Sequence, residues 1–392
     1  MSIHNPVNIR KVLKSEYKSR FPDGDRLGKV AGLVNWETFR SVLEPLFKNN
    51  GEGRPHVDLV LMTKVLVLQS WYGLSDEQVE KDCRDRLTFM NFLGYPSKVP
   101  DARTIWLFKE RLANEKGKEK ELWDELRRQL DRYRVKVKQG QMKDAVFIEL
   151  GGFRSEGKSG PIVAIAPHTG YAQDSTIIEA DSGAPTDEDV KRLKENEEEK
   201  KTISLSSPSA SENEGVLSTG TAAANVITKP RGDKARTKRS RDGTWTKKRG
   251  RSYFGFKLHT KDELSTEFIS DFEVTSASVH DNNVDLTNPG ETCVRDRGYT
   301  GGKGLCANMI RATRGHALTR KDKELNRFLS GVRAPVEHPF SVMKRVFHAG
   351  RVFVTTVIRV KVRMLFVCTC YNLFRALTLS ESGMGQPMKN ND

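Results

Sequence analysis

The stretch RAPVEHPFSVMK, residues 333–344, decides how the C-terminal part of this chain folds. Its two prolines, Pro335 and Pro339, would break the interior of a helix because proline has no backbone N–H donor. Both are tolerated if a helix begins near Val336, since the N–H groups of a first helical turn have no intrahelical partner. We therefore expect a helix to begin at this point.

The expected helix has two distinct faces. Glu337 and Lys344, seven residues apart, share one face about two turns long. Four apolar side chains recur at helical spacing and predict a buried stripe on another face: Val336, Phe340, Met343 and Phe347. The sequence thus predicts a carboxylate held near the start of a helix, with cations within reach.

The pattern Arg333-x3-Glu337-x6-Lys344 resembles most of the signature of the DDE transposases of bacterial and archaeal insertion sequences. Ser330 stands where that signature usually has tyrosine. The resemblance implies that Glu337 is the third catalytic acid and a metal ligand. It also implies that Arg333 and Lys344 hold phosphate, the arginine bidentately and the lysine as a point charge. By itself, Glu337 could equally be a solvated glutamate favoured by the helix dipole.

Composition indicates the class of partner. The 392 residues include 66 Lys and Arg against 51 Asp and Glu, a formal net charge of +15. Such an excess favours a polyanion such as nucleic acid, although a merely basic protein has the same balance. The length is enough for two domains.

The cysteines and the apolar runs exclude several classes of protein. The five cysteines form no C-x-x-C pair, so neither a disulfide framework nor a zinc site is indicated, and a reducing cytosol fits best. The longest apolar runs, 59–68 and 352–379, are interrupted by basic residues, so we expect no membrane span. The expected location is the cytoplasm, in association with nucleoid DNA.

Residues 1–134 are expected to form an all-α domain, with Ser75 and Gln78 as a capping box and Asp101 as an N-cap. Its last two helices, 76–89 and 101–112, are joined by a short Gly/Pro connection, an order compatible with helix-turn-helix packing. Candidate DNA contacts on the second of these helices could equally be solvated positions of a bundle helix: Arg103, Thr104, Lys109 and Arg111. The resemblance implies that this domain binds transposon ends.

Residues 135–381 have mixed periodicity, with strands around 135–149, 253–260, 267–275 and 292–296, the 337 helix, a short strand and a last long helix. The pattern alone indicates an α/β domain. The resemblance implies an RNase H-like catalytic domain. Residues 382–392 are expected to be a flexible tail.

Residues 151–228 resemble an insertion, and the part from about 185 to 226 is expected to be a loop or disordered because it is rich in charge, Ser, Gly and Ala. The segment 229–251 is densely basic and contains Trp245, which suits a DNA backbone better than a solvated loop. We expect DNA contacts from its basic residues: Arg236, Lys238, Arg239, Arg241, Lys247, Lys248 and Arg249.

Asp296 is the clearest second acid. It ends an apolar strand and is followed by Arg-Gly-Tyr, which resembles the Asp-x-Gly-Tyr/Phe pattern around the second catalytic aspartate of the family. An aspartate in an ordinary strand-to-loop turn is the alternative. Asp281 is the rival candidate, and we interpret it as the N-cap of a following helix.

Two segments compete for the first acid. Asp144-Ala-Val-Phe-Ile-Glu149 and Asp174-Ser-Thr-Ile-Ile-Glu179 are near copies, and both resemble the Asp-Ala-Thr-x-Ile-Glu strand of the family. Asp144 follows the helical domain at the expected spacing, whereas Asp174 has the longer match. Both stay candidates, one in the true first strand and the other in an insertion or partial duplication.

Together these residues predict metal-dependent phosphoryl transfer on DNA. Carboxylates suit Mg²⁺ or Mn²⁺, and two such ions can stabilise both the attacking and the leaving oxygen. The resemblance implies a transposase that binds terminal inverted repeats, cleaves double-stranded DNA and joins the freed end to target DNA, with a homodimer in synapsis. The alternatives are a catalytically inactive DNA-binding protein derived from a transposase and, more weakly, a nuclease of the same fold.

Overall fold

The structure is a computed structural model. It describes residues 8–47, 56–131, 170–182, 240–248, 250–299, 303–315 and 317–382, together with the backbone of 146–149 and 162–165. Asp144, the expected turn before residue 146, the stretch from 185 to 226 and the tail from 383 onward lie outside the described residues.

The described residues from 8 to 131 are helical, as predicted. The helices are α1 (Ile9–Arg20), α2 (Arg26–Ala31), α3 (Thr38–Leu43), the 3₁₀ helix η1 (Glu44–Phe47), α4 (Leu59–Tyr72), α5 (Asp76–Asp85), α6 (Leu87–Leu93), α7 (Ala102–Asn114) and α8 (Lys118–Leu130).

The predicted caps in this region are confirmed. Ser75 and Gln78 form a reciprocal capping box, and the Asp101 side chain accepts a hydrogen bond from the Thr104 backbone. The single helix expected over 76–89 is instead two helices. Arg86 has extended backbone angles and separates α5 from α6.

In the described residues, seven strands form one sheet: β3 (Tyr171–Ala180), β4 (Thr244–Lys248), β5 (Arg251–Glu263), β6 (Ile269–Ser276), β7 (Thr292–Arg295), β8 (Leu305–Asn308) and β9 (Arg351–Val352). β3 lies in the middle, antiparallel to β5 and parallel to β7. β6 pairs antiparallel with β5, and β8 pairs parallel with β7. The order across the sheet is β4, β5, β3, β7 and β8, with β6 also paired to β5 and β9 also paired to β3.

Within the segment 151–228, which we expect to be inserted material, β3 belongs to the seven-stranded sheet. The burial of β3 between its two neighbours depends on pairing with residues about 80 and 120 positions later, which no local pattern reveals. The segment after Asp144 behaves differently. β1 (Val146–Glu149) pairs only with β2 (Ile162–Ile165) among the described strands, in a separate two-stranded sheet.

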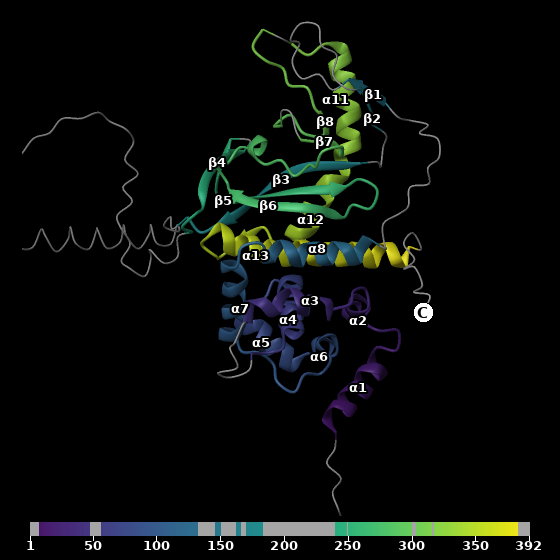
Figure 1. Cartoon of the computed structure of the whole chain (residues 1–392), viewed down its shortest axis with the longest axis vertical. Coiled ribbons are helices and arrows are strands. Elements are labelled where there is room, and N and C mark those ends of the chain that lie inside the picture. The colour runs from purple at the N-terminus through teal and green to yellow at the C-terminus, as the bar shows by residue number, and fades with distance from the viewer. Residues whose placement is uncertain are drawn as a thin grey trace, which may run out of the picture.

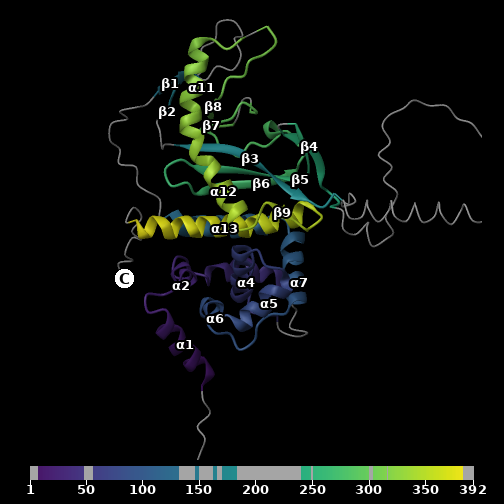
Figure 2. The same cartoon turned by 180° about the vertical axis from the view of Figure 1, so that it is seen from behind.

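The C-terminal helices are α11 (Arg320–Arg333), the 3₁₀ turn η4 (Ala334–Val336), α12 (Glu337–Arg345) and α13 (Val357–Glu381). The predicted helix start near Val336 is confirmed. The predicted stripe is also confirmed, since each of its four side chains is at most 8% exposed. α11 was not predicted, and it places Arg333 at the end of one helix, with Glu337 at the start of the next (Figure 2).

Helix α13 runs beside α8 between the sheet and the N-terminal helices (Figure 1). It contacts α4 and α7 on one side and β6 and α12 on the other, which explains why it is apolar around most of its circumference. Two of its basic residues form ion pairs, Arg359 with Glu110 and Lys361 with Glu273. No helix in the described part of the chain is long and apolar enough to cross a bilayer.

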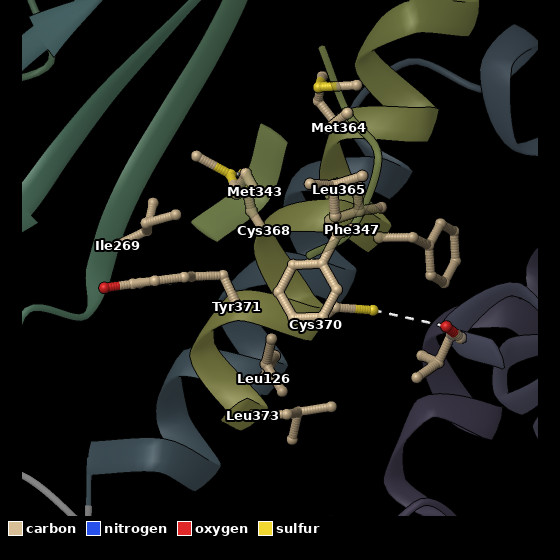
Figure 3. Close-up of a cluster of buried hydrophobic side chains, with 14 of the residues drawn as sticks. Leu126, Ile269, Met343, Phe347, Met364, Leu365, Cys368, Cys370, Tyr371 and Leu373 are labelled. Carbon is tan, nitrogen blue, oxygen red and sulfur yellow. Dashed lines mark hydrogen bonds between the residues drawn. The ribbon is translucent and has the colours of Figure 1, made fainter. Parts of the chain in front are cut away.

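Figure 3 shows the core around α13. Met343 of α12 lies against Cys368 of α13, and Phe347, just beyond the end of α12, packs on Phe374 of α13. The Cys370 thiol points to the other side, where its sulfur lies 3.5 Å from the Val67 carbonyl oxygen. This packing fixes α12 on α13. Because Glu337 is the first residue of α12, the same packing fixes its backbone relative to the sheet.

Candidate active site

Asp174 and Asp296 lie on neighbouring parallel strands. Gln173 of β3 pairs with Arg295 of β7, and the residue after each of them is an aspartate, Asp174 and Asp296. Asp296 immediately follows the end of β7. The charge of Asp296 acts on Asp174, which places the two carboxylates in one electrostatic environment.

Arg333 connects these aspartates to Glu337. Its Nη1 donates a 2.6 Å hydrogen bond to Asp174 Oδ2, and its Nη2 lies 4.0 Å from Glu337 Oε1. The negative charges of Asp174, Asp296 and Glu337 all stabilise the guanidinium. The structure therefore gathers three acids that are far apart in the sequence around one arginine.

The three acids differ in exposure. The Asp174 side chain is 19% exposed and that of Arg333 13%, whereas the Glu337 side chain is 76% exposed. Burial raises the pKa of the Asp174 carboxyl, although the Arg333 charge and the hydrogen bonds from Arg333 and the Ser175 backbone oppose that rise. The site therefore consists of a half-buried ion pair with one acid at its open edge.

The residues on either side of Asp174 hold β3 in place. The Gln173 side chain donates to the Val284 carbonyl at 2.7 Å, and the Ser175 hydroxyl donates to Asp281 Oδ1 at 2.9 Å. Lys257 of β5 also donates to Asp281, at 3.0 Å. Successive strand residues point to opposite faces, so these contacts fix β3 from the face opposite to the Asp174 side chain.

The interpretation of Asp281 as an N-cap is wrong. His280 occupies that position before the short 3₁₀ helix η3 (Asp281–Asn283), and the Asp281 carboxylate binds Ser175 and Lys257 instead. The nearby lysine and the strand hydroxyl compete successfully for the carboxylate, a long-range effect that the local sequence does not show.

The end of β7, which carries Asp296, is anchored by Arg295. This side chain is 2% exposed, donates to Asp285 and Thr287, and lies with its guanidinium 5.4 Å from the ring centre of Tyr299. The Tyr299 backbone N–H in turn donates to the Asp296 carbonyl at 3.2 Å. The arginine and the buried tyrosine together fix the turn that presents Asp296.

A basic surface lies near one end of the sheet. Burial lowers the pKa of the Lys344 amine, and the nearby charge of Lys248 lowers it further. Lys247 and Lys248 are exposed on β4, together with Trp245, which is 55% exposed, and Arg241 is exposed just before that strand. The structure thus brings Lys344 close to Lys248, whereas Arg236, Lys238, Arg239 and Arg249 lie outside the described residues.

The candidate contacts on α7 are largely used inside the protein. Lys109 binds Asp76 at 2.5 Å, and the Arg111 guanidinium lies 4.5 Å from the ring centre of Phe47. The helix also contacts α13, so it is not free to enter a DNA groove along its whole length. Arg103 is exposed.

Carboxylate oxygens are the donors that Mg²⁺ and Mn²⁺ prefer, so the chemistry of the three acids fits a divalent ion. Their spacing does not yet fit one. Among the described residues, no group of three His, Cys, Asp or Glu side chains lies close enough to hold a metal ion. Arg333 is the cation that binds Asp174 in this arrangement.

Four residues that support the site were missed from the sequence: Gln173, Ser175, Lys257 and Arg295. Two of them flank Asp174 and one precedes Asp296, so a signal was available, namely polar side chains directly beside the candidate acids. Lys257 had no such signal, because its partner Asp281 lies on a different segment.

Comparison with known protein families gave two matches. Residues 15–111 match a family described as a transposase domain (DUF772), and residues 227–373 match one described as a transposase DDE domain. The second range contains Asp296 and Glu337, whereas Asp144 and Asp174 both precede it. No solved structure matches the chain.

Proposed function

Because the chain belongs to the insertion-sequence DDE transposases, which act on DNA in transposition, we propose that it binds transposon ends and catalyses cleavage and strand transfer. The spacing of Arg333, Glu337 and Lys344 supports a place in the insertion sequence five family. The observation that carries the proposal is the arrangement of Asp174, Asp296 and Glu337 around Arg333.

The sheet supports an RNase H-like catalytic domain within 135–381, preceded by a DNA-binding domain within 1–134. Three antiparallel strands, β6, β5 and β3, are followed by β7 and β8, which run parallel to β3. The first acid lies on β3, the second directly follows the neighbouring strand β7, and the third lies on a helix that follows them in the chain. This order of strands and helix brings together acids that are distant in the sequence.

Asp174 is the better candidate for the first acid. Its strand is hydrogen-bonded to the strand that ends at Asp296, and Arg333 binds it directly. Asp144 lies outside the described residues, and the strand that follows it, β1, belongs to the separate two-stranded sheet. We therefore propose Asp174, Asp296 and Glu337 as the catalytic acids.

If they moved closer together than they lie in this structure, these three carboxylates would hold the divalent ion that DDE transposases normally use, Mg²⁺ or Mn²⁺. When bound, such an ion polarises the scissile phosphate and stabilises charge on the attacking and leaving oxygens. The buried Asp174 would be the most rigid ligand and the exposed Glu337 the most mobile.

Arg333 has two roles in this proposal. Through its hydrogen bond it neutralises Asp174 and so keeps a half-buried carboxylate in place. With that carboxylate neutralised in another way, the guanidinium would be able to bind a DNA phosphate with two parallel hydrogen bonds. The buried Arg333 Nε has no hydrogen-bond partner, which supports an arrangement that DNA completes.

Lys344 and Lys248 would bind the DNA backbone, together with Lys247, Arg241 and the remaining basic residues of the segment 229–251. The two close lysines repel one another, and a phosphate between them would relieve that repulsion. Transposition brings two ends together, so we propose a homodimer that acts on nucleoid DNA in the cytoplasm.

The test is a cleavage assay with double-stranded DNA that carries the sequences flanking the gene, in the presence of Mn²⁺. The variants Asp174→Asn, Asp296→Asn and Glu337→Gln should each lower the cleavage rate by at least about 10²-fold while DNA binding is retained. Glu324→Gln is the matched control, since Glu324 is an exposed acid on the neighbouring helix α11.

Asp144→Asn separates the two candidates for the first acid. Cleavage that survives Asp174→Asn but is lost in Asp144→Asn would overturn the assignment of Asp174. Binding of the ends without cleavage by the unmodified protein would instead identify a DNA-binding protein derived from a transposase.

A further inference from the structure

Two cysteines lie side by side at the edge of the proposed catalytic sheet. Cys293 of β7 is paired in register with Cys306 of β8, so the two side chains leave the same face of the sheet. Neighbouring strands lie about 4.8 Å apart, which is within the range of Cα separations that a disulfide spans. The Cys306 Sγ lies 3.8 Å from the Thr287 hydroxyl oxygen, and each thiol acts on the pKa of the other.

The two thiols differ in reactivity. The hydrogen bond with Cys293 lowers the pKa of the Cys306 thiol, and the charge of Arg295 lowers it further, despite the opposing effect of burial. The hydrogen bond with Cys306 and burial raise the pKa of Cys293. Cys306 is also the more accessible of the two, since it is half-buried whereas Cys293 is buried. Because the thiolate is the nucleophilic form and an oxidant must reach it, the accessible Cys306 sulfur is the candidate nucleophile.

We propose that Cys306 and Cys293 are a peroxide-reactive thiol pair that closes to a disulfide between β7 and β8. The Cys306 sulfur attacks one oxygen of hydrogen peroxide, which breaks the O–O bond, gives a sulfenic acid and releases hydroxide, protonated to water. The Cys293 sulfur then attacks the sulfenic sulfur, the S–S bond forms and a second water leaves. Two thiols and one peroxide thus give one disulfide and two waters. A small dithiol reduces the disulfide back to two thiols by exchange and is itself oxidised to a disulfide.

The remaining cysteines lack this arrangement. Burial raises the pKa of the Cys83 thiol to about 12. Cys368 and Cys370 are both buried in α13 and point to different sides, toward Met343 and toward the Val67 carbonyl (Figure 3). These three thiols provide internal references for the reactivity of Cys306.

The position of the pair connects it to the proposed active site. Cys293 precedes Asp296 by three residues, and Arg295, which anchors the end of β7, lies close to both sulfurs. A disulfide removes the thiolate that faces Arg295 and joins the two strands covalently. Any effect of oxidation on cleavage rests on the proposed function, whereas the thiol chemistry does not.

The experiment uses the full-length reduced protein without DNA. After a short exposure to hydrogen peroxide and blocking of free thiols, peptide mass spectrometry should find a Cys293–Cys306 disulfide that dithiothreitol removes. With Cys293→Ser, the reaction should stop at a Cys306 sulfenic acid, which dimedone traps. In the unoxidised protein at neutral pH, Cys306 should be alkylated at least about 10-fold faster than Cys83.

Alkylation of Cys306 no faster than that of Cys83, or peroxide treatment that leaves Cys293 and Cys306 unlinked, would overturn the inference. Both measurements use the unmodified protein, so a variant that fails to fold does not affect them. A protein that forms the disulfide but never cleaves DNA would contradict the proposed function and leave this inference intact.

Discussion

The guanidinium of Arg333 holds the carboxylate of Asp174 at 2.6 Å, across 159 residues of sequence. Both side chains are largely buried, so breaking the pair has a large free-energy cost. Removing one member of a buried ion pair costs roughly 3–5 kcal/mol, because the other charge is left without a partner. The pair therefore ties α11 to the central strand of the sheet.

Arg333→Ala should lower the melting temperature by several degrees. Mn²⁺ should then raise the melting temperature of this variant by more than it raises that of the unmodified protein. The reason is that a divalent ion can replace the lost positive charge beside Asp174. Thermal melts with and without Mn²⁺ measure both effects. They need no DNA, so they test the binding site independently of catalysis.

The matched control for this experiment is Arg320→Ala. Arg320 pairs with Glu324 on the same helix, but its side chain is 93% exposed, so its loss should change stability by less than about 0.5 kcal/mol. Equal Mn²⁺ shifts in the Arg333→Ala variant and the unmodified protein would show that Arg333 does not compete with metal for Asp174.

Lys344 and Lys248 provide a second prediction. If both bind DNA phosphates, Lys344→Ala and Lys248→Ala should each weaken binding and reduce the slope of log K against log salt by about 0.9 per lost contact. Arg128→Ala should leave that slope unchanged, because Arg128 is bound to Glu125 on the same helix. Binding titrations over a range of salt concentrations check this, and unchanged slopes for both lysine variants would remove them from the DNA interface.

The sequence predicted the local features of the site and missed the long-range ones. The start of α12 follows from two prolines and an apolar stripe within one short segment, so the signal is local. The choice between Asp144 and Asp174 is different, since their strands are near copies. Only the pairing of β3 with β5 and β7 distinguishes them, and pairing over such distances leaves no local pattern.

Helix α11 was missed for a physical reason. Its sequence, RKDKELNRFLSGVR, is mostly polar, and only three of its side chains are buried. Its capping box uses Asp322 in place of the usual glutamate or glutamine. Because α11 carries Arg333 to Asp174, missing the helix also meant missing the contact that connects the acids.

His259 predicts how stability depends on pH. It is fully buried in β5, with its Nε2 atom 2.9 Å from the Thr275 hydroxyl oxygen. Burial lowers its pKa to about 4, while nearby Asp281 raises it and Lys257 lowers it. The unfolded chain binds a proton near pH 6.5 but the folded protein does not, so stability is greatest above that pH and falls as the pH drops toward 4.

The loss between those two values should reach up to about 3 kcal/mol for this one group. Urea unfolding at several pH values checks the slope. His259→Gln should flatten it, because glutamine does not titrate, even if the variant is less stable at neutral pH. The same slope in both proteins would assign the pH dependence to other groups.

Two glycines provide the last prediction, because their replacement by alanine should change the free energy of unfolding in opposite directions. Gly255 of β5 has φ of +151° and pairs with Glu179 of β3. A Cβ there would overlap the Ile178 carbonyl oxygen and lie 2.9 Å from the Ala180 nitrogen. Gly331 lies in α11 with ordinary helical geometry, and a Cβ added there would meet no atom within 4 Å. One site therefore requires glycine and the other only tolerates it.

Gly255→Ala should cost at least about 3 kcal/mol, because the backbone of β3 would have to move away from β5. Gly331→Ala should instead stabilise the protein by about 0.5–1 kcal/mol, since alanine loses less conformational entropy in a helix. Urea unfolding of the two variants tests both. If Gly255→Ala were as stable as the unmodified protein, β3 could not lie against β5 as described. The position of β3 in the sheet, which places Asp174 beside Asp296, would then be wrong.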